Sequence, residues 1–246
     1  MLRWAGAIVV AAGMHATFAT AAAGTERLRP RGATWPLGTE RLSDERALSR
    51  WAYSERLGWA RRRPSRTAPG VARLRGLTED GRPELYLALR SYRDPHGRVW
   101  IQVRLPRRPN GSTGWVPRPY LARLRIVETM LEIDRSALRA RLWRRGRPVW
   151  SARTGIGKRG TPTPAGRFYV REKLRGGSPI YGPWAIGTSA YSRLSEWPGG
   201  GVIGIHGTDQ PQLIPGRPSH GCVRLTNHDV AALARRLPIG SPIWVH

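Results

Sequence analysis

This 246-residue chain contains a single cysteine, Cys222. A lone cysteine excludes an intramolecular disulfide. Without a Cys-x-x-Cys or His-Glu-x-x-His frame, the chain also lacks the usual basis of a zinc site. No long apolar run is present either, because His15 interrupts residues 5–18 and a membrane-spanning helix needs about 20 apolar residues. These absences exclude a disulfide-stapled scaffold and argue against a transmembrane helix.

Acidic residues and lysine are scarce as well. The chain has 42 basic and 16 acidic residues, and lysine occurs only at Lys158 and Lys173, so arginine supplies most of the net charge of +26. Such a charge favours polyanionic partners, although arginines spread over solvated faces would give the same total. The sequence has no aromatic stacking motif, zinc knuckle or recognition-helix signature. We therefore expect no nucleic-acid partner and keep anionic cell-wall polymers as a candidate.

The N-terminus has the three parts of a signal peptide. Arg3 provides the positive charge, residues 5–18 the apolar region, and residues 21–23 the small side chains at which cleavage occurs. We expect residues 1–23 to direct export to the cell wall or periplasm, either as a cleaved signal peptide or as an uncleaved anchor. An unpaired cysteine in an exported protein then suggests a specific role for the thiol, because cysteines outside the cytoplasm are usually paired in disulfides.

The rest of the sequence predicts a mainly β protein. It has 29 glycines, 21 prolines and 11 tryptophans, and little helical periodicity. Residues 24–65 are an Arg- and Pro-rich segment and linker, with a short helix predicted over residues 42–54. Residues 66–122 are predicted to be a small β module. Within it, residues 100–116 resemble the bacterial SH3-like modules that precede cell-wall enzymes, and we expect their core to contain Trp100, Val103 and Trp115.

Residues 123–246 are predicted to form a second, β-rich domain. Strands are expected at 127–133, 138–143, 148–151, 167–170, 185–187, 202–206, 222–225 and 243–245. One helix should follow the cysteine strand directly. Thr226 and Asp229 have the spacing of a capping box, and apolar residues then recur at helical spacing from Val230 until Pro238.

The surroundings of Cys222 raise the question of a nucleophile. In an extended segment His220 and Cys222 point to the same side, because side chains alternate along a strand. His206 ends an apolar strand, and its imidazole would reach the thiol if the two strands were neighbours. Gly207 and Gly221 permit close backbone approach, and amides near the cysteine would stabilise an oxyanion.

Two alternatives stay open on these residues alone. A free cysteine is often simply a small buried core residue. The two histidines could instead be zinc ligands, with Cys222 as the third ligand and His228 as the fourth.

Three motifs together resemble the signature of L,D-transpeptidase catalytic domains of the YkuD type. They are Ile-His-Gly-Thr at 205–208, Ser-His-Gly-Cys-Val-Arg-Leu at 219–225, and Gly-Ile-Gly-Lys-Arg-Gly-Thr-Pro-Thr-Pro-Ala-Gly-Arg-Phe-Tyr at 155–169. The resemblance implies that Cys222 is the nucleophile and His206 the general base, with the Gly207 carbonyl orienting the imidazole. It also implies that His220 supports the site and that the amides of Gly221 and Cys222 are oxyanion donors.

The same resemblance assigns residues to substrate binding. Arg224 would contact a substrate carboxylate or brace the pocket, because its planar fork suits a carboxylate. Residues 178–184 fall where such enzymes carry a lid. Within this segment Tyr181 and Trp184 would either line the substrate groove or cover the core.

The function implied by the resemblance is that of a peptidoglycan L,D-transpeptidase. Such an enzyme forms 3→3 cross-links between stem peptides through a cysteine thioester, serves cell-wall biogenesis and cell shape, needs no metal or cofactor, and is sensitive to carbapenems. One alternative is an L,D-carboxypeptidase with water as the acceptor. Another is a non-catalytic wall-binding protein whose β module and arginine-rich surface hold polymer.

Overall fold

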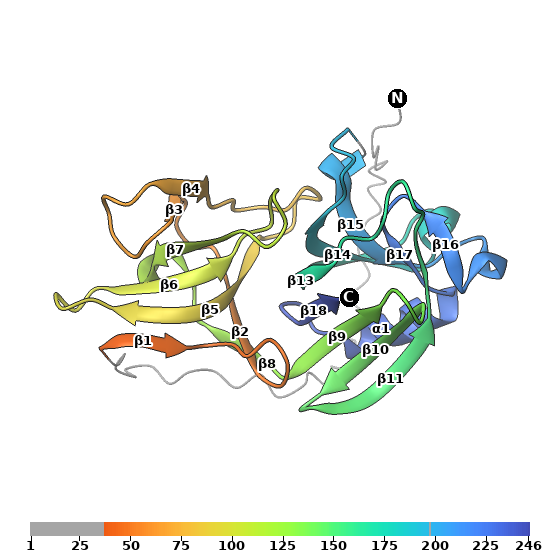
Figure 1. Cartoon of the computed structure of the whole chain (residues 1–246), viewed down its shortest axis with the longest axis horizontal. Coiled ribbons are helices and arrows are strands. Elements are labelled where there is room, and N and C mark those ends of the chain that lie inside the picture. Colours follow the sequence, from red (N-terminus) through yellow and green to blue (C-terminus); the bar gives the residue numbers. More distant parts are fainter. Residues whose placement is uncertain (1–36, 197) are drawn as a thin grey trace, which may run out of the picture.

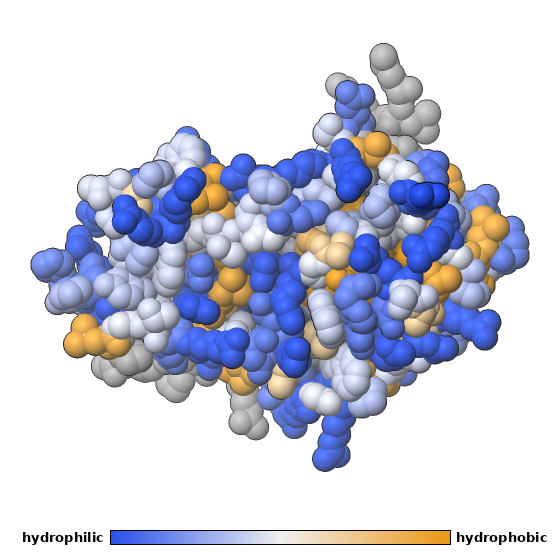
Figure 2. Space-filling model, in the orientation of Figure 1, coloured by the Kyte–Doolittle hydropathy of each residue, from blue (hydrophilic) through white to orange (hydrophobic). Residues whose placement is uncertain are grey.

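The computed structural model describes residues 37–196 and 198–246, which form two β sheets side by side (Figure 1). The mainly β class is confirmed, and the one α-helix of the described residues lies near the C-terminus. The predicted signal peptide lies outside these residues. In the part of the chain that is described, no helix is long and apolar enough to cross a membrane. The face in Figure 2 is mostly hydrophilic, with small hydrophobic areas scattered over it.

The N-terminal unit, residues 37–127, forms the first sheet. Among the described residues this sheet has eight strands in the order β4-β3-β7-β6-β5-β2-β8, with β1 paired to β5. Trp100 and Val103 are buried in it as expected, whereas Trp115 is half-buried and meets Tyr92 edge-on. The elements are β1 Gly38–Arg41, β2 Ser49–Tyr53, β3 Trp59–Arg61, β4 Gly70–Arg73, β5 Leu85–Arg93, β6 Val99–Arg104, β7 Thr113–Pro117, η1 Arg118–Tyr120 and β8 Arg125–Val127.

The helix predicted over residues 42–54 is wrong. These residues form a turn followed by β2, which pairs with β5 and β8. Asp44 Oδ1 accepts the amides of residues 46, 47 and 48 at 2.7, 2.9 and 3.0 Å, and Ser43 Oγ accepts the Arg50 amide at 2.8 Å. Side chains that bind nearby amides in this way favour a turn over a helix. Strands β1 to β3 therefore belong to the first sheet and not to a linker.

The C-terminal unit, residues 128–246, forms the second sheet. In the described chain it has ten strands in the order β11-β10-β9-β18-β13-β14-β15-β17-β12-β16. The elements are β9 Thr129–Asp134, β10 Arg139–Arg144, β11 Arg147–Arg153, β12 Gly155–Gly157, β13 Gly166–Arg175, η2 Pro179–Tyr181, β14 Trp184–Tyr191, η3 Pro198–Gly201, β15 Val202–His206, η4 Pro211–Leu213, β16 Gly216–Ser219, β17 Val223–Arg224, α1 Asn227–Arg236 and β18 Pro242–Val245.

The predicted helix after the cysteine strand is confirmed. Thr226 is the N-cap of α1, and its hydroxyl oxygen accepts the Asp229 amide at 3.1 Å. The buried face of the helix presents Val230 and Leu233 to the core of the second sheet. This helix therefore fixes the segment that directly follows the cysteine.

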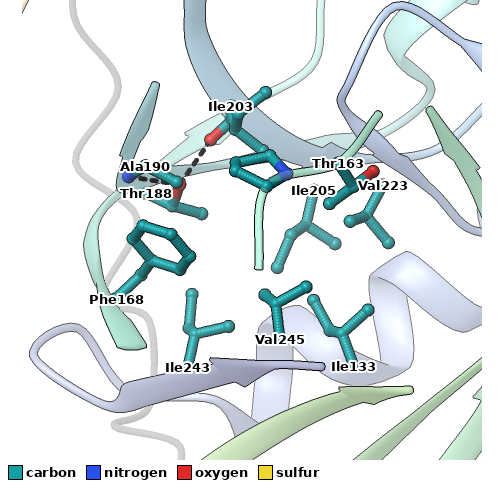
Figure 3. Close-up of a pocket in the computed structure, with 11 residues that line it drawn as sticks. Ile133, Thr163, Phe168, Thr188, Ala190, Ile203, Ile205, Val223, Ile243 and Val245 are labelled. Carbon is teal, nitrogen blue, oxygen red and sulfur yellow. Dashed lines mark hydrogen bonds between the residues drawn. The ribbon is translucent and has the colours of Figure 1, made fainter. Parts of the chain in front are cut away.

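A small apolar cavity lies in the core of the C-terminal unit (Figure 3). Its lining includes Ile203, Ile205 and Val223 from the strands β15 and β17. At its border the Thr188 hydroxyl donates to the Ile203 carbonyl at 2.6 Å and the Thr163 hydroxyl to the Gly221 carbonyl at 2.8 Å, so both hydroxyl groups of the lining are satisfied. With no acid, base or nucleophile in its lining, the cavity is a packing void behind these two strands.

The two units share a buried interface. Residues from both form one hydrophobic cluster, in which the Tyr169 hydroxyl donates to the Leu85 carbonyl at 3.0 Å. The fully buried Arg171 side chain pairs with Glu84, also fully buried, and lies 2.8 Å from Glu79. Because a buried charge is costly without its partner, this contact fixes one unit against the other.

Candidate active site

Two neighbouring parallel strands bring Cys222 and His206 to one face of the second sheet. β15 pairs in parallel with β17, and His206 lies opposite Arg224. Because side chains alternate, Gly204, His206, Cys222 and Arg224 share a face, while the residues between them enter the core. Gly204 has no side chain to occupy this face, and its amide donates to Cys222 Sγ at 3.4 Å.

His206 is held in the tautomer that a general base requires. Its Nδ1 lies 2.6 Å from the carbonyl oxygen of Gly207. A carbonyl only accepts, so Nδ1 carries the proton and Nε2 keeps its lone pair. Burial lowers the pKa of His206 to about 4, against the opposing effect of the Gly207 contact. At neutral pH the imidazole is therefore uncharged and able to take a proton.

The half-buried Cys222 thiol is protonated at rest. Burial raises its pKa above the ordinary value, while the Gly204 amide and the charge of Arg224 act in the opposite direction. Thiol and imidazole thus form a neutral pair and not a thiolate–imidazolium pair. The sulfur has to lose its proton as it attacks, and a neighbouring neutral imidazole is suited to accept it.

The Thr-Pro-Thr-Pro motif holds the loop that carries the cysteine. Thr163 Oγ1 donates to the Gly221 carbonyl at 2.8 Å and accepts the Gly157 amide at 2.9 Å. A Cβ on Gly157 would lie 2.2 Å from the carbonyl oxygen of Thr161, so this approach requires glycine. The two motifs, far apart in the sequence, are one structural unit.

Ser219 closes the turn that precedes the thiol. Its hydroxyl donates to the Cys222 carbonyl at 2.6 Å and accepts the Gly221 amide at 3.1 Å. Gly221 has a φ of 128°, a conformation that side-chain-bearing residues rarely adopt. Because the Gly221 amide is engaged by Ser219, the Cys222 amide is the stronger candidate for an oxyanion donor.

His220 lies at the rim of the site beside Lys158. The Lys158 Nζ is 3.0 Å from His220 Nε2, and because an ammonium only donates, Nε2 is the acceptor. Burial, together with the charges of Lys158 and Arg224, lowers the pKa of His220. A neutral imidazole is thus flanked by two cations, which favour an anionic group at this rim. The sequence analysis did not single out Lys158, although it lies in one of the quoted motifs.

The two aromatic residues of the segment expected to be a lid, Tyr181 and Trp184, make different contacts. Tyr181 meets His206 edge-on, with ring centroids 4.9 Å apart, and burial raises the pKa of its hydroxyl. Trp184 packs against the core of the C-terminal unit beneath the Arg175 guanidinium, 5.2 Å away. Of these two aromatic residues, Tyr181 is therefore the one that contacts His206.

Arg224 and Asn227 complete the site. Arg224 Nη1 is 3.5 Å from Gln210 Oε1, and its buried Nε has no hydrogen-bond partner within the described residues. Asn227 Oδ1 accepts the Thr208 amide at 3.0 Å and would lie 2.2 Å from a Cβ on Gly207. The sequence analysis missed Asn227, because an asparagine in the first turn of a helix gives no sign of a contact with a distant loop.

The arrangement does not support the zinc alternative. His228, its fourth ligand, is exposed on α1, with Nδ1 3.4 Å from Asp229. Within residues 37–196 and 198–246, no group of three or more His, Cys, Asp or Glu side chains is placed to hold a metal ion.

Comparison with known proteins agrees with the motifs. Residues 128–245 match the family model YkuD, the L,D-transpeptidase catalytic domain. The YkuD protein of Bacillus subtilis (strain 168) is 32% identical over 91 residues, which are 37% of this chain and 49% of that protein. The YkuD protein of Bacillus licheniformis is 33% identical over 105 residues, 43% of this chain and 58% of that protein. The chain thus spans about half the length of these relatives.

Solved L,D-transpeptidases give weaker likenesses. A crystal structure of a mutant Enterococcus faecium L,D-transpeptidase has a TM-score of 0.39 at 23% identity, over 48% of this chain and 49% of that one. An L,D-transpeptidase from Mycobacterium tuberculosis H37Rv has a TM-score of 0.42 at 13% identity, over 79% of this chain and 95% of that one. At these TM-scores the likeness supports no inference about function.

The family match falls on the part of the chain that carries Cys222, His206 and the loops that hold them. None of these matches supports the SH3-like resemblance of the N-terminal unit. Residues 128–245 are thus similar to the L,D-transpeptidase catalytic domains of the YkuD family.

Proposed function

We propose that the protein is an exported peptidoglycan L,D-transpeptidase that forms 3→3 cross-links through a thioester on Cys222. The observation that carries the proposal is the pairing of β15 with β17. This pairing puts a protonated thiol on the same face as a neutral imidazole, whose Nδ1 lies 2.6 Å from the Gly207 carbonyl. Nucleophile, base and orienting acceptor are the parts that covalent acyl transfer requires. The family-model match over residues 128–245 supports the same chemistry.

The first half-reaction forms the thioester. Cys222 Sγ attacks the carbonyl carbon of the third residue of a tetrapeptide stem, and its proton passes to His206 Nε2. The bond between that carbon and the D-alanine nitrogen then breaks, and His206 returns the proton to the departing amine. The low pKa of His206 makes its protonated form a strong acid, which suits this second transfer.

The second half-reaction forms the cross-link. The side-chain amine of a neighbouring stem attacks the thioester carbon, and its proton passes to His206. The carbon–sulfur bond breaks as the new amide forms, and the proton returns to the Cys222 sulfur. In both halves the negative charge on the carbonyl oxygen would be stabilised by the Cys222 amide, since the Gly221 amide is engaged by Ser219.

Two side chains are suited to hold the stem peptide. The Arg224 guanidinium, whose Nε lacks a hydrogen-bond partner among the described residues, would bind a substrate carboxylate. Tyr181, edge-on to His206, would cover the reacting bond. Trp184, which packs on the core, would shape the groove only indirectly.

The test uses purified disaccharide tetrapeptide stems, with products identified by mass spectrometry. We expect the wild-type protein to release D-alanine and form cross-linked dimer, and Cys222→Ala to do neither. Dimer formed by Cys222→Ala would sink the proposal. Tripeptide without dimer, even with added amine acceptor, would identify an L,D-carboxypeptidase. Salt-sensitive wall binding without turnover would identify a wall-binding protein.

A further inference from the structure

The connection between β14 and β15 borders the proposed nucleophile and is rich in glycine. It begins at Ser192 and ends with Gly199, Gly200 and Gly201, whose φ values of 70°, 66° and 79° lie in the left-handed region. A glycine run offers no side chains to fasten itself, and it loses much conformational freedom when ordered. The three glycines can therefore be held only through their backbone groups.

Arg108, which lies between β6 and β7 in the N-terminal unit, donates to backbone carbonyls of the connection. Its Nε and Nη2 donate to the Ser192 carbonyl at 3.1 and 2.8 Å, and Nη2 also reaches the carbonyls of Leu194 at 3.2 Å and Gly200 at 3.0 Å. A Cβ on Gly201 would lie 2.7 Å from Nη2, so the guanidinium fits closely against the glycines. A planar fork can serve several acceptors at once, whereas an ammonium cannot reproduce that geometry.

Tyr191, which leads into the connection, is held by the same unit. The Asn110 side chain donates to the Tyr191 carbonyl at 2.8 Å and accepts its amide at 2.9 Å. The Tyr191 hydroxyl donates to Glu79 at 2.7 Å, and its ring lies 4.9 Å from the Arg108 guanidinium. The N-terminal unit thus holds the backbone, the ring and the hydroxyl of this residue.

Both ends of the connection reach the surroundings of the thiol. The Ser192 hydroxyl donates to the His220 carbonyl at 3.4 Å, and a Cβ on Gly221 would lie 3.5 Å from Ser192 Oγ. The Ser192 amide donates to the Gly201 carbonyl at 2.8 Å, which closes the connection at its base. Gly201 leads directly into β15, the strand of the proposed base. A shift of the connection would therefore move both the turn before Cys222 and the strand beside it.

We propose that Arg108 is a positioning residue for acyl transfer on Cys222, holding the β14–β15 connection so that it sets the turn carrying the thiol. The proposal rests on the proposed function. It makes the N-terminal unit a working part of the active site. Arg108 lies outside residues 128–245, so the family match assigns it no role.

The test compares Arg108→Ala and Arg108→Lys with Arg107→Ala in the full-length chain. Arg107 is a matched control, because it is the neighbouring half-buried arginine and its guanidinium donates to the Val71 carbonyl inside the N-terminal unit. The first measurement is amide hydrogen exchange without substrate. Peptides that contain Ser192, Gly201 and Gly221 should exchange about tenfold faster in Arg108→Ala, because charge-assisted hydrogen bonds that oppose local opening are lost. They should be unchanged in Arg107→Ala.

The second measurement is turnover of tetrapeptide stems. In Arg108→Ala, kcat should fall by about 10- to 100-fold, as misplacing catalytic groups by about 1 Å does. KM should stay within about twofold of wild type, because Arg108 is not proposed to touch substrate. In Arg108→Lys, kcat should lie between the values of wild type and Arg108→Ala. If the alanine variant does not fold, the lysine variant is the one compared with wild type.

Two results would overturn the proposal: exchange in the Arg108 variants that matches Arg107→Ala, or an unchanged kcat. Turnover that is absent in the wild-type protein would refute the proposed function separately. In that case the exchange comparison still decides whether Arg108 holds the turn before Cys222.

Discussion

Replacing Glu84 with glutamine measures how strongly the two units depend on each other. The fully buried Glu84 carboxylate accepts Arg171 Nε at 2.9 Å, Arg75 Nη2 at 3.4 Å and the Leu85 amide at 3.2 Å. Glutamine keeps the size of the side chain but removes its charge. The buried Arg171 guanidinium is then left with Glu79, at 2.8 Å, as its remaining anionic partner.

The magnitude follows from the burial of both partners. Removing one partner of a buried ion pair costs about 3–5 kcal/mol of unfolding free energy. Burial alone would raise the pKa of Glu79, but its contacts with Arg171, Tyr191 and Arg75 lower it to about 2, so Glu79 stays ionised and compensates in part. We therefore expect a loss of about 3 kcal/mol, which in a chain of this size lowers Tm by roughly 6–12 °C.

Thermal unfolding followed by circular dichroism gives Tm, and urea titration gives the free energy. The decisive comparison is a double variant, Glu84→Met with Arg171→Met, which removes both charges and should be more stable than Glu84→Gln alone. A fall in Tm of less than about 2 °C for Glu84→Gln would refute the reasoning. A double variant less stable than the single one would refute it as well.

Other predictions concern the site itself. The rate of Cys222 acylation should stay constant from neutral pH down to about pH 5. It should fall as the pH drops through about 4, because protonation of His206 removes the base. A fall centred on 6.5, the ordinary histidine pKa, would contradict the role of burial. Lys158→Met should raise the pKa of His220, measured by NMR titration, because a neighbouring cation is lost. The control Lys173→Met should leave that pKa unchanged, because Lys173 Nζ donates instead to the Ala234 carbonyl at 2.9 Å. A carbapenem should add covalently to Cys222, and an adduct of the same mass on Cys222→Ala would show that another group reacts.

Local signals explain what the sequence predicted correctly. The strands expected at 138–143 and 148–151 form the hairpin of β10 and β11, in whose turn Arg145 and Gly146 adopt positive φ, 50° and 75°. The helix after the cysteine strand begins directly after its predicted cap, Thr226. Strand β15 follows the run of β-branched and apolar residues expected at 202–206. Each of these depends on residues close together in the chain.

What the sequence could not predict depends on distant partners. The helix predicted over residues 42–54 fails because Ser43 and Asp44 turn the chain and β5 offers a strand to pair with. That β15 lies beside β17 was only a condition in the sequence argument, since strand order is set by the whole sheet. The contacts of Asn227 with the loop at Thr208 and of Arg108 with Ser192 join segments that no periodicity connects.

The strand order also bears on how the chain assembles as it is made. β18 comes last among the described elements, yet it lies between β9 and β13, parallel to the first and antiparallel to the second (Figure 1). In a chain that is made from its N-terminus onward, β9 and β13 are complete before β18, so each has one edge without a paired strand. Open edges invite pairing with other chains. The second sheet can therefore become continuous only after its last strand has been delivered.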